Sequence, residues 1–339
     1  MYRRYLVTGC AGFIGWRVCE LLLEQGELVV GIDNLNDAYD PRLKQWRLER
    51  LEREASFRFC PIDITDMEAT DALFAGDVEA PEADDLERRP YSAVIHLAAR
   101  AGIRASVEKP SAYFKDNVDG TLGLLEHCRK FQTPKIVLAS SSSLYGAHNP
   151  VPYREDADTD RPFSPYAASK KAAETLCYTY HHLHGLDVSV LRYFTVYGPA
   201  GRPDMSVFRF IRWIAEGKPV RVFGDGLQSR DFTYVDDIAR GTVAALRPLG
   251  YEVINLGGNH PTKVSALIDK IAELLGKEPQ IEHLSTHPTD VPATCASIEK
   301  ASRLLDWAPL TLLPEGLRRS IEWYQANREL VLALELGLQ

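Results

Sequence analysis

The sequence has few of the features that metal centres, disulfide scaffolds and membrane spans require. Only six of its 339 residues are cysteine, and no two of them form a close pair with the spacing of metal ligands. No stretch is long and apolar enough to predict a transmembrane helix, and the N-terminus does not predict a signal peptide. We therefore expect reduced cysteines in a cytoplasmic protein with no metal site and no membrane contact.

An excess of positive charge is also absent. The chain has 39 Lys and Arg residues against 47 Asp and Glu residues, a formal net charge of −8. Such a chain is a poor candidate for binding nucleic acid, whose phosphates attract basic surfaces. If the ligand is an anion, a few placed arginines and helix N-termini must supply the positive charge. The acidic stretch Gly76–Pro90 is predicted to be a solvated loop.

Short apolar runs alternate with helical patterns in the first half of the chain. The predicted strands are Tyr5–Val7, Leu28–Ile32, Phe57–Cys60, Ala93–Leu97, Lys135–Ala139 and Val188–Leu191. The predicted helices are Gly12–Gln25, Pro41–Glu54, Met67–Phe74, Asn117–Phe131 and Pro165–His184. Continuously apolar strands that alternate with helices predict an α/β fold, a Rossmann-type doubly wound parallel sheet with helices on both faces.

The pattern loosens after about Pro199. The predicted elements there are the helices Ser206–Glu216, Val235–Leu246, Val264–Leu275 and Pro314–Arg328 and the strand Val220–Phe223. This half is expected to form a smaller, mixed α/β C-terminal lobe. We predict two units, residues 1–195 and residues 196–339, with an interleaved boundary between them.

A glycine-rich turn joins the first predicted strand to the first predicted helix. It reads Thr-Gly-Cys-Ala-Gly-Phe-Ile-Gly from Thr8 to Gly15. Glycines here let the backbone approach a pyrophosphate, and the helix N-terminus supplies N–H donors. The predicted contacts are Gly9, Gly12, Phe13, Ile14 and Gly15. The first glycine interval differs by one residue from the usual dinucleotide fingerprint, so a tight turn with nothing bound is the alternative.

Residues at the ends of the next strands strengthen the prediction. Asp33, followed by Asn34, can accept hydrogen bonds from the ribose hydroxyls of adenosine and would repel a 2′-phosphate, which favours NAD over NADP. Asp63 and Ile64 end the third strand, where adenine could be recognised, although Asp63 alone would be a helix cap. The fourth strand ends in small residues that suit a ligand close to the backbone: Leu97, Ala98 and Ala99.

Candidate groups for chemistry follow the fifth strand. A run of serines stands at the edge where open α/β sheets bind ligands, namely Ser140, Ser141, Ser142 and Ser143, although a polar loop start would fit this run as well. Tyr166 and Lys170 lie four residues apart in a predicted helix and therefore share a face. Because a nearby cation favours the phenolate of tyrosine, whose reference pKa is about 10, the pair is suited to act as a general base for a hydroxyl.

Taken in this order, the glycine turn, the serine strand end with Tyr145 and Gly146, and the Tyr166 and Lys170 pair resemble extended short-chain dehydrogenases/reductases over essentially the whole chain. The resemblance implies that NAD is the cofactor and Tyr166 the base. It also implies that Lys170 holds the nicotinamide ribose and lowers the Tyr166 pKa, and that Ser141 hydrogen-bonds the reacting hydroxyl. The other residues that it implies for the cofactor site are Asn117, Ser140 and Tyr193. Residues 1–195 would then bind NAD and residues 196–339 a nucleotide sugar, and a homodimer is expected through the helices around Asn117 and Tyr166.

Within this family, several stretches are similar to UDP-glucuronate 4-epimerases. They are His96–Arg104, Ala139–Gly146, Arg192–Pro199, Gly201–Met205 and the helix that follows Asn36–Asp40. UDP-glucose 4-epimerases typically have Asn where this chain has Thr195. The 4,6-dehydratases of the family have Asp and Glu where Ser142 and Ser143 stand, and UDP-glucuronate decarboxylases usually have Glu at the Ser143 position.

The similarity implies that the protein inverts C4 of UDP-glucuronic acid to give UDP-galacturonic acid through a 4-keto intermediate. The alternatives are a 4-epimerase of a neutral UDP-sugar such as UDP-glucose and a non-catalytic NAD-binding scaffold. The carboxylate of a uronic acid needs donors, which Ser142, Ser143 and Thr195 offer as neutral groups. Arg202 offers a charged group, and Arg104 is balanced between substrate contact and an ordinary surface role.

The nucleotide would be bound by the second half of the chain. Arg230 is expected at the diphosphate, and Val222 and Phe223 against uracil, although both would also fit a core strand. Asp290 is expected at the substrate too. It ends the run His287–Asp290, where the family often has Arg or Gln before Pro-Gly-Asp, and this departure leaves the diphosphate contacts and the nucleotide open.

Overall fold

The computed structural model describes residues 3–76, 90–286 and 289–336. Nearly all of the predicted loop at Gly76–Pro90 lies outside these ranges, as do His287 and Pro288. Within the described ranges, no helix combines the length and the apolar character that crossing a membrane requires.

A seven-stranded sheet forms the larger part of the molecule. Across the sheet, the strands are β10 (Tyr251–Leu256), β6 (Asp187–Tyr193), β5 (Lys135–Ser141), β4 (Ala93–His96), β1 (Arg4–Thr8), β2 (Leu28–Ile32) and β3 (Phe57–Cys60). Every neighbouring pair is parallel. The strand order reverses between β1 and β4, which opens a crevice at the carboxyl ends of these strands, the usual ligand site of open α/β sheets.

Helices cover both faces of this sheet. One face packs against α3 (Met67–Ala75), α6 (Gly120–Lys130) and α7 (Pro165–His184), and the other against α1 (Phe13–Glu24), α2 (Pro41–Leu51), α9 (Val235–Ala244) and α11 (Glu299–Leu305). Within β1, Leu6 belongs to the first core, while Tyr5 and Val7 belong to the second. Because both faces are buried, the strands are continuous apolar runs.

Short helical elements bring functional residues to the crevice. Between β4 and α6 the chain forms α4 (Ile103–Glu108), α5 (Pro110–Phe114) and a π-helical turn, η1 (Lys115–Asp119). The turn of 3₁₀-helix after β5 is η2 (Ser142–Tyr145). Both η1 and η2 lie beside the N-terminal half of α7.

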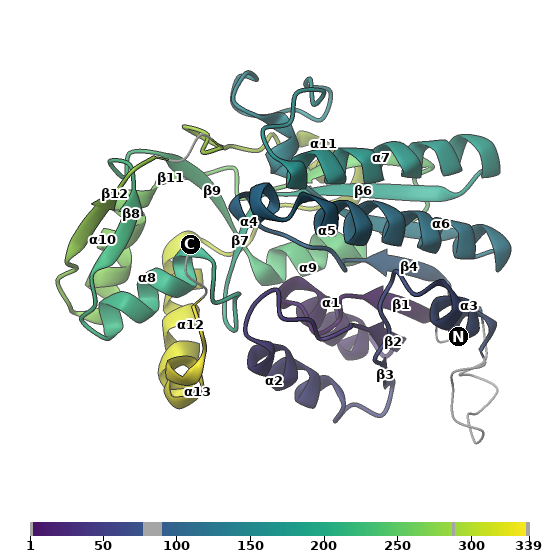
Figure 1. Ribbon diagram of the computed structural model, residues 1–339, viewed down its shortest axis with the longest axis horizontal. Coiled ribbons are helices and arrows are strands. Elements are labelled where there is room, and N and C mark those ends of the chain that lie inside the picture. The colour runs from purple at the N-terminus through teal and green to yellow at the C-terminus, as the bar shows by residue number, and fades with distance from the viewer. Residues whose placement is uncertain (1–2, 77–89, 287–288, 337–339) are drawn as a thin grey trace.

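A smaller unit with its own core lies beside the sheet (Figure 1). It has one sheet of β7 (Thr195–Tyr197), β9 (Ser229–Tyr234) and β11 (Pro261–Lys263) and a parallel pair of β8 (Val220–Phe223) and β12 (Ile281–Leu284). Its helices are α8 (Ser206–Ala215), α10 (Val264–Leu275), α12 (Leu313–Ala326) and α13 (Arg328–Ala333). In Figure 1, β7 and β9 lie between the large sheet and the outer elements α8, α10, β8 and β12.

The predicted fold class is confirmed, and each strand and helix predicted in the first half is present with ends a few residues apart. Strand β10 was not predicted, although it pairs with β6 along its whole length. It lies within residues 196–339 and returns to the sheet of the first half, so the division near residue 195 stays a proposal about domain organisation. The predicted terminal helix Pro314–Arg328 ends at Ala326, and a separate helix, α13, follows.

Candidate active site

The glycine turn brings backbone to the floor of the crevice. Gly9 has a φ of +73° and donates its N–H to the carbonyl of Ile32 over 2.7 Å. A Cβ on Gly9 would lie 2.7 Å from the backbone nitrogen of Ala98, and one on Gly15 would lie 2.0 Å from the Gly9 carbonyl. Gly12 is the N-cap of α1, so the helix begins facing the crevice. Only glycine fits these positions, and α1 presents its N–H donors there.

Polar groups at the ends of β2 and β3 are linked to each other. The Asp33 carboxylate accepts the N–H of Leu35 over 2.8 Å and lies 3.4 Å from the ammonium of Lys44. The Asn34 amide donates to the Asp63 carboxylate over 2.7 Å. Burial of Asp63 opposes its ionisation, but hydrogen bonds from Thr65 and Asn34 outweigh burial, and the pKa of Asp63 is lowered. The Asp63 carboxylate is therefore fixed and ionised.

A buried histidine ties β1 to β4 below Leu97–Ala99. His96 is 2% exposed, and its Nδ1 lies 2.8 Å from Thr8 Oγ1 and its Nε2 3.0 Å from Thr121 Oγ1. Thr121 Oγ1 donates to the carbonyl of Asn117 over 2.6 Å, so the proton between His96 and Thr121 belongs to Nε2. Burial lowers the pKa of His96 to about 3. His96 is therefore neutral, with Nδ1 accepting from Thr8.

The tyrosine and lysine of α7 meet the serine strand end. Tyr166 follows the N-cap Ser164 by two residues and makes a side-chain hydrogen bond with Ser141. The Lys170 ammonium donates to the carbonyl of Ala139 over 3.0 Å. The structure therefore brings Tyr166, Lys170 and Ser141 together.

The electrostatics of this pair differ from the prediction. Burial lowers the pKa of Lys170 to about 8, against the attraction of Glu174. Burial also raises the pKa of Tyr166, while the bond with Ser141 and the charge of Arg202 act in the opposite direction. The expected lowering of the Tyr166 pKa is wrong for the protein alone, because the loss of hydration outweighs these contacts.

The four serines do not share one role. The Ser140 hydroxyl donates over 2.5 Å to Glu174, a buried carboxylate on α7. Ser141 Oγ accepts the N–H of Ser143 over 3.1 Å and so caps η2. The hydroxyls of Ser142 and Ser143 lie at the cleft wall. Because the Ser140 hydroxyl is engaged by Glu174, the predicted contact of Ser140 with the cofactor stays a prediction.

Asn117 lies behind the site. It is 1% exposed. The amide oxygen accepts the N–H of Arg100 over 2.8 Å. The amide nitrogen donates to the Arg100 carbonyl over 3.0 Å and to Ser169 Oγ over 2.9 Å. The side chain connects the π-helical turn η1, the segment after β4 and α7. Asn117 therefore fixes these three segments relative to one another. A direct contact of Asn117 with the cofactor stays a prediction.

Charged and aromatic side chains of the smaller unit meet Arg104, which lies on α4 of the larger unit. The Arg104 guanidinium lies 3.5 Å from the centre of the Phe223 ring and 3.0 Å from the Asp290 carboxylate. Burial lowers the pKa of Arg230, and Asp290 attracts its charge. Val222 is 3% exposed and belongs to the core of the smaller unit, as the core-strand alternative expected.

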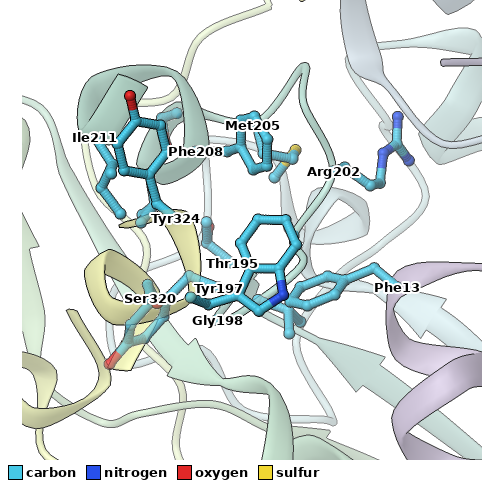
Figure 2. A pocket seen from close by; sticks show the side chains of 15 residues that line it. Phe13, Thr195, Tyr197, Gly198, Arg202, Met205, Phe208, Ile211, Ser320 and Tyr324 are labelled. Carbon is cyan, nitrogen blue, oxygen red and sulfur yellow. The ribbon is translucent and has the colours of Figure 1, made fainter. Parts of the chain in front are cut away.

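Arg202 stands where the two units meet. Its Nε and Nη2 donate to the two oxygens of Asp204 over 3.0 and 2.6 Å, and Nη2 also reaches the carbonyl of Ala101 over 3.3 Å. Figure 2 shows Arg202 at the side of a small pocket near Thr195 and Met205, with its guanidinium directed away from Tyr324. That pocket has room for about one water molecule, with a volume of about 20 Å³, so it is not a separate ligand site.

One cleft joins these groups. It has a volume of about 570 Å³, within the range of small-molecule and cofactor sites. Its walls include every residue predicted for the site except Asn117. They also include residues that the sequence did not single out, among them Lys44, Asp204 and Arg209. Lys44 and Asp204 lie in stretches that resemble UDP-glucuronate 4-epimerases, the helix after Asn36–Asp40 and the run Gly201–Met205, whereas Arg209 carried no signal of its own.

A model of the NAD dependent epimerase/dehydratase family matches residues 5–257, more than half of the chain. The chain belongs to this family. It is 55% identical over 333 residues to the UDP-glucuronate 4-epimerase of Thermodesulfobacterium geofontis (strain OPF15), covering 98% of this chain and 99% of that protein. UDP-glucuronate 4-epimerase 4 of Arabidopsis thaliana is 42% identical over 94% of this chain and 74% of its own length.

Solved structures of similar epimerases match the whole fold. The UDP-glucuronic acid 4-epimerase of Bacillus cereus, in complex with UDP-glucuronic acid and NAD, gives a TM-score of 0.86 at 37% identity, over 95% of this chain and 99% of that one. The UDP-glucose 4-epimerase of Thermotoga maritima with UDP-glucose also gives 0.86, at 32% identity, over 96% and 99%. The fold alone therefore does not choose the sugar.

The cleft of this family member fits NAD, its cofactor. The glycine turn leaves no room for side chains at Gly9 and Gly15, so a pyrophosphate can lie against backbone N–H groups. Asp33 lines the same cleft, and its predicted role, to accept ribose hydroxyls and disfavour a 2′-phosphate, stays a prediction. From there the cleft continues to Tyr166 and Lys170, where a nicotinamide would reach the chemical groups.

Proposed function

We propose that this protein is a 4-epimerase that interconverts UDP-glucuronic acid and UDP-galacturonic acid. The observation that carries the proposal is the position of Arg202 and Thr195, which line the same cleft as Tyr166, Lys170 and Ser141. A cation and neutral donors beside Tyr166 suit a sugar in which the carbon next to the reacting C4 carries a carboxylate. The 55% identity to a UDP-glucuronate 4-epimerase supports the same substrate.

Tyr166 is the proposed base and acid. Its phenolate, which the positive charge of bound NAD⁺ would favour against the effect of burial, takes the proton of the C4 hydroxyl and returns it after the sugar has presented its other face. Ser141, hydrogen-bonded to Tyr166, orients the reacting hydroxyl. NAD, when bound, supplies the acceptor and the donor of the C4 hydride. Lys170, whose ammonium lies 3.0 Å from the Ala139 carbonyl, is proposed to hold the nicotinamide ribose.

The carboxylate at C6 is proposed to face Ser142, Ser143, Thr195 and Arg202. The 4-keto sugar acid is a β-keto acid and is prone to lose CO₂. Neutral hydroxyl donors can hold the carboxylate so that its C5–C6 bond stays out of the geometry that expels CO₂. None of these four residues is an acid that could protonate C5 or C6, which separates this cleft from that of a dehydratase.

The UDP group is proposed to bind against the smaller unit. Arg230 and Arg104 supply positive charge to the diphosphate, and Asp290 orients Arg104 through a contact of 3.0 Å. The Arg104 guanidinium covers the face of Phe223 at 3.5 Å. Uracil can therefore stack on this face of Phe223 only after Arg104 moves toward the diphosphate.

The experiment is incubation of the purified protein with UDP-glucuronic acid, without added NAD, and analysis of the products by NMR. We expect UDP-galacturonic acid and no CO₂ loss. A parallel incubation uses UDP-glucose, the substrate of the neutral-sugar alternative. Turnover of UDP-glucose alone would replace the proposal by that alternative, and NAD released on denaturation without turnover of either sugar would favour the scaffold.

We also propose that the protein is a cytoplasmic homodimer. The six cysteines are all free, as in a reducing compartment. Helices α5, α6 and α7 pack side by side and leave large apolar side chains exposed, including Phe114 on α5 at 42% and Leu122 on α6 at 39%. A two-fold contact through these helices would cover them. Light scattering that gives the mass of a monomer would contradict the dimer.

A further inference from the structure

Three segments of the chain meet at one buried arginine. Arg47, on α2, is fully buried. Its Nη2 and Nε donate to the carbonyl of Ala200 over 2.7 and 3.2 Å. Its Nη1 donates to the carbonyl of Ala11 over 2.9 Å and to the hydroxyl of Tyr39 over 2.7 Å. One guanidinium thus holds the glycine turn, the segment before α2 and the segment that carries Arg202.

The partners of Arg47 are neutral throughout the described ranges. Burying a guanidinium without a carboxylate is costly, and an apolar side chain would fill the same space at a lower desolvation cost. What an apolar side chain cannot do is fix three oxygen atoms from three segments with one planar group. The arrangement is therefore suited to positioning and not to stability alone.

Ala200 is held in a conformation that its sequence does not favour. It has a φ of +52°, in the left-handed region that non-glycine residues seldom adopt, and it is fully buried. Two hydrogen bonds from Arg47 end on its carbonyl. Arg202 follows two residues later, so the conformation at Ala200 sets where the backbone of Arg202 begins.

Tyr39 forms a second connection to the same arginine. The Arg202 guanidinium lies over the Tyr39 ring, 5.3 Å from its centre, and the hydroxyl of that ring accepts from Arg47. Asp204 and the Ala101 carbonyl bind Nε and Nη2 of Arg202. Among the described contacts, Nη1 of Arg202 makes no hydrogen bond, so this edge is the one available to a ligand in the cleft.

We propose that Arg47 and Tyr39 are positioning residues for substrate selection, which hold the Arg202 guanidinium where it meets the carboxylate of a sugar acid. The inference rests on the proposed function for the identity of that carboxylate. Arg47 acts through Ala200 and through Tyr39, without touching the substrate. This assigns a role to the helix after Asn36–Asp40, one of the stretches that resembles UDP-glucuronate 4-epimerases.

The test is a double-mutant cycle on binding, which requires no turnover. Dissociation constants of UDP-glucuronic acid and UDP-glucose are measured by calorimetry in the Tyr166→Phe background, in which the sugar is not converted, for the otherwise wild-type protein, Arg47→Met, Arg202→Met and the double variant. We expect Arg47→Met to reduce the preference for UDP-glucuronic acid by about tenfold or more, the effect of misplacing one charge-assisted hydrogen bond. In the Arg202→Met background the same change should reduce it by less than about twofold.

Two further variants keep the result clear. Arg50→Met is the matched control, because Arg50 is also on α2 and contacts Trp46, outside the cleft. It should leave the preference unchanged. Tyr39→Phe removes only the hydroxyl that accepts a hydrogen bond from Arg47. This variant replaces Arg47→Met in the test if Arg47→Met does not fold. It should reduce the preference by a few fold in the wild type and not in Arg202→Met.

The inference is overturned if the wild type does not prefer UDP-glucuronic acid over UDP-glucose, or if Arg47→Met and Tyr39→Phe leave this preference unchanged. It is also overturned if the effect of the double variant equals the product of the two single effects, because Arg47 would then act independently of Arg202. NAD released on denaturation is measured for each variant, because Arg47 also holds Ala11. Loss of NAD with an unchanged preference would assign Arg47 to the glycine turn alone. The proposed function fails by a different observation, namely binding of UDP-glucuronic acid without formation of UDP-galacturonic acid.

Discussion

Arg192 binds both carboxylate oxygens of Glu174, over 3.0 and 2.8 Å, beside the strand that ends in Ser141, the serine proposed to orient the reacting hydroxyl. Both side chains are about 5% exposed or less. The same carboxylate accepts from Ser140, and Arg192 also donates to the hydroxyl of Tyr145 over 3.0 Å. This buried pair connects α7, β5, β6 and η2, the elements that carry Lys170 and Ser141.

Breaking this pair should destabilise the fold strongly. Glu174→Gln leaves the guanidinium of Arg192 buried without its counter-charge, and such a loss costs about 3–5 kcal/mol. Urea unfolding measures the change. The control is Arg129→Met, because Arg129 pairs with Glu126 on the surface, with 47% and 40% of the two side chains exposed. That variant should lose less than about 1 kcal/mol, and an equally small loss in Glu174→Gln would contradict the role of the pair.

Removing the Tyr166 hydroxyl should stop the chemistry and leave the cofactor bound. Tyr166→Phe keeps the ring but lacks the group that takes the C4 proton, so turnover should fall by about 10²–10⁴-fold. Initial rates and the NAD released on denaturation are measured together. Tyr178→Phe, at a tyrosine that is 53% exposed, is the control and should be as active as the wild type. Activity retained in Tyr166→Phe would refute the assignment of the base.

The donors around the proposed carboxylate site should control the fate of the 4-keto intermediate. Thr195→Ala removes a neutral donor, and the share of turnovers that release CO₂ should rise by about threefold to tenfold, as for one lost hydrogen bond. NMR of the products gives the ratio of epimer to decarboxylated sugar. Thr175→Ala, on the exposed side of α7, is the control. An unchanged ratio in Thr195→Ala would remove Thr195 from the carboxylate site.

The buried His96 should make the fold sensitive to mild acid. Its pKa is lowered to about 3 in the folded protein, against about 6.5 when it is exposed on unfolding. Between these two pH values the unfolded chain binds a proton at His96 that the folded chain does not bind. The contribution of His96 to the free energy of unfolding is therefore fully present above pH about 6.5 and is lost as the pH drops toward 3. Between pH 6.5 and 5 this one group should cost about 2 kcal/mol.

Denaturant unfolding of the wild type and His96→Gln at both pH values measures this contribution. The other groups titrate in both proteins and cancel in the comparison. The loss of stability on acidification should be smaller in His96→Gln by about that amount. Equal losses in the two proteins would show that His96 is protonated in the fold.

The alternation of strands and helices was enough to predict the large sheet, because strands buried on both faces are continuous apolar runs. The glycine turn, Asp33 and the pair Tyr166 and Lys170 could be found because each has a fixed place relative to a strand end or a helix turn. Strand β10 was missed, since only its last three residues are buried and its pairing with β6 joins residues far apart in the chain.

What the sequence could not predict depends on contacts between distant segments. Arg47 looked like one charge among many on α2, yet it is fully buried against Ala11 and Ala200. The hydroxyl of Ser140 is turned toward Glu174, and nothing in the serine run distinguishes it from Ser141. The direction of the Tyr166 pKa depends on its burial, which the spacing of two residues does not give.

The most direct test of the central claim is the fate of the C4 hydrogen. The purified protein, with no NAD added, is given UDP-glucuronic acid that carries deuterium at C4, and the product is analysed by NMR. The account predicts UDP-galacturonic acid with deuterium retained at C4, because the same bound NAD takes and returns the hydride within one cleft. Product with hydrogen from solvent at C4 would contradict it.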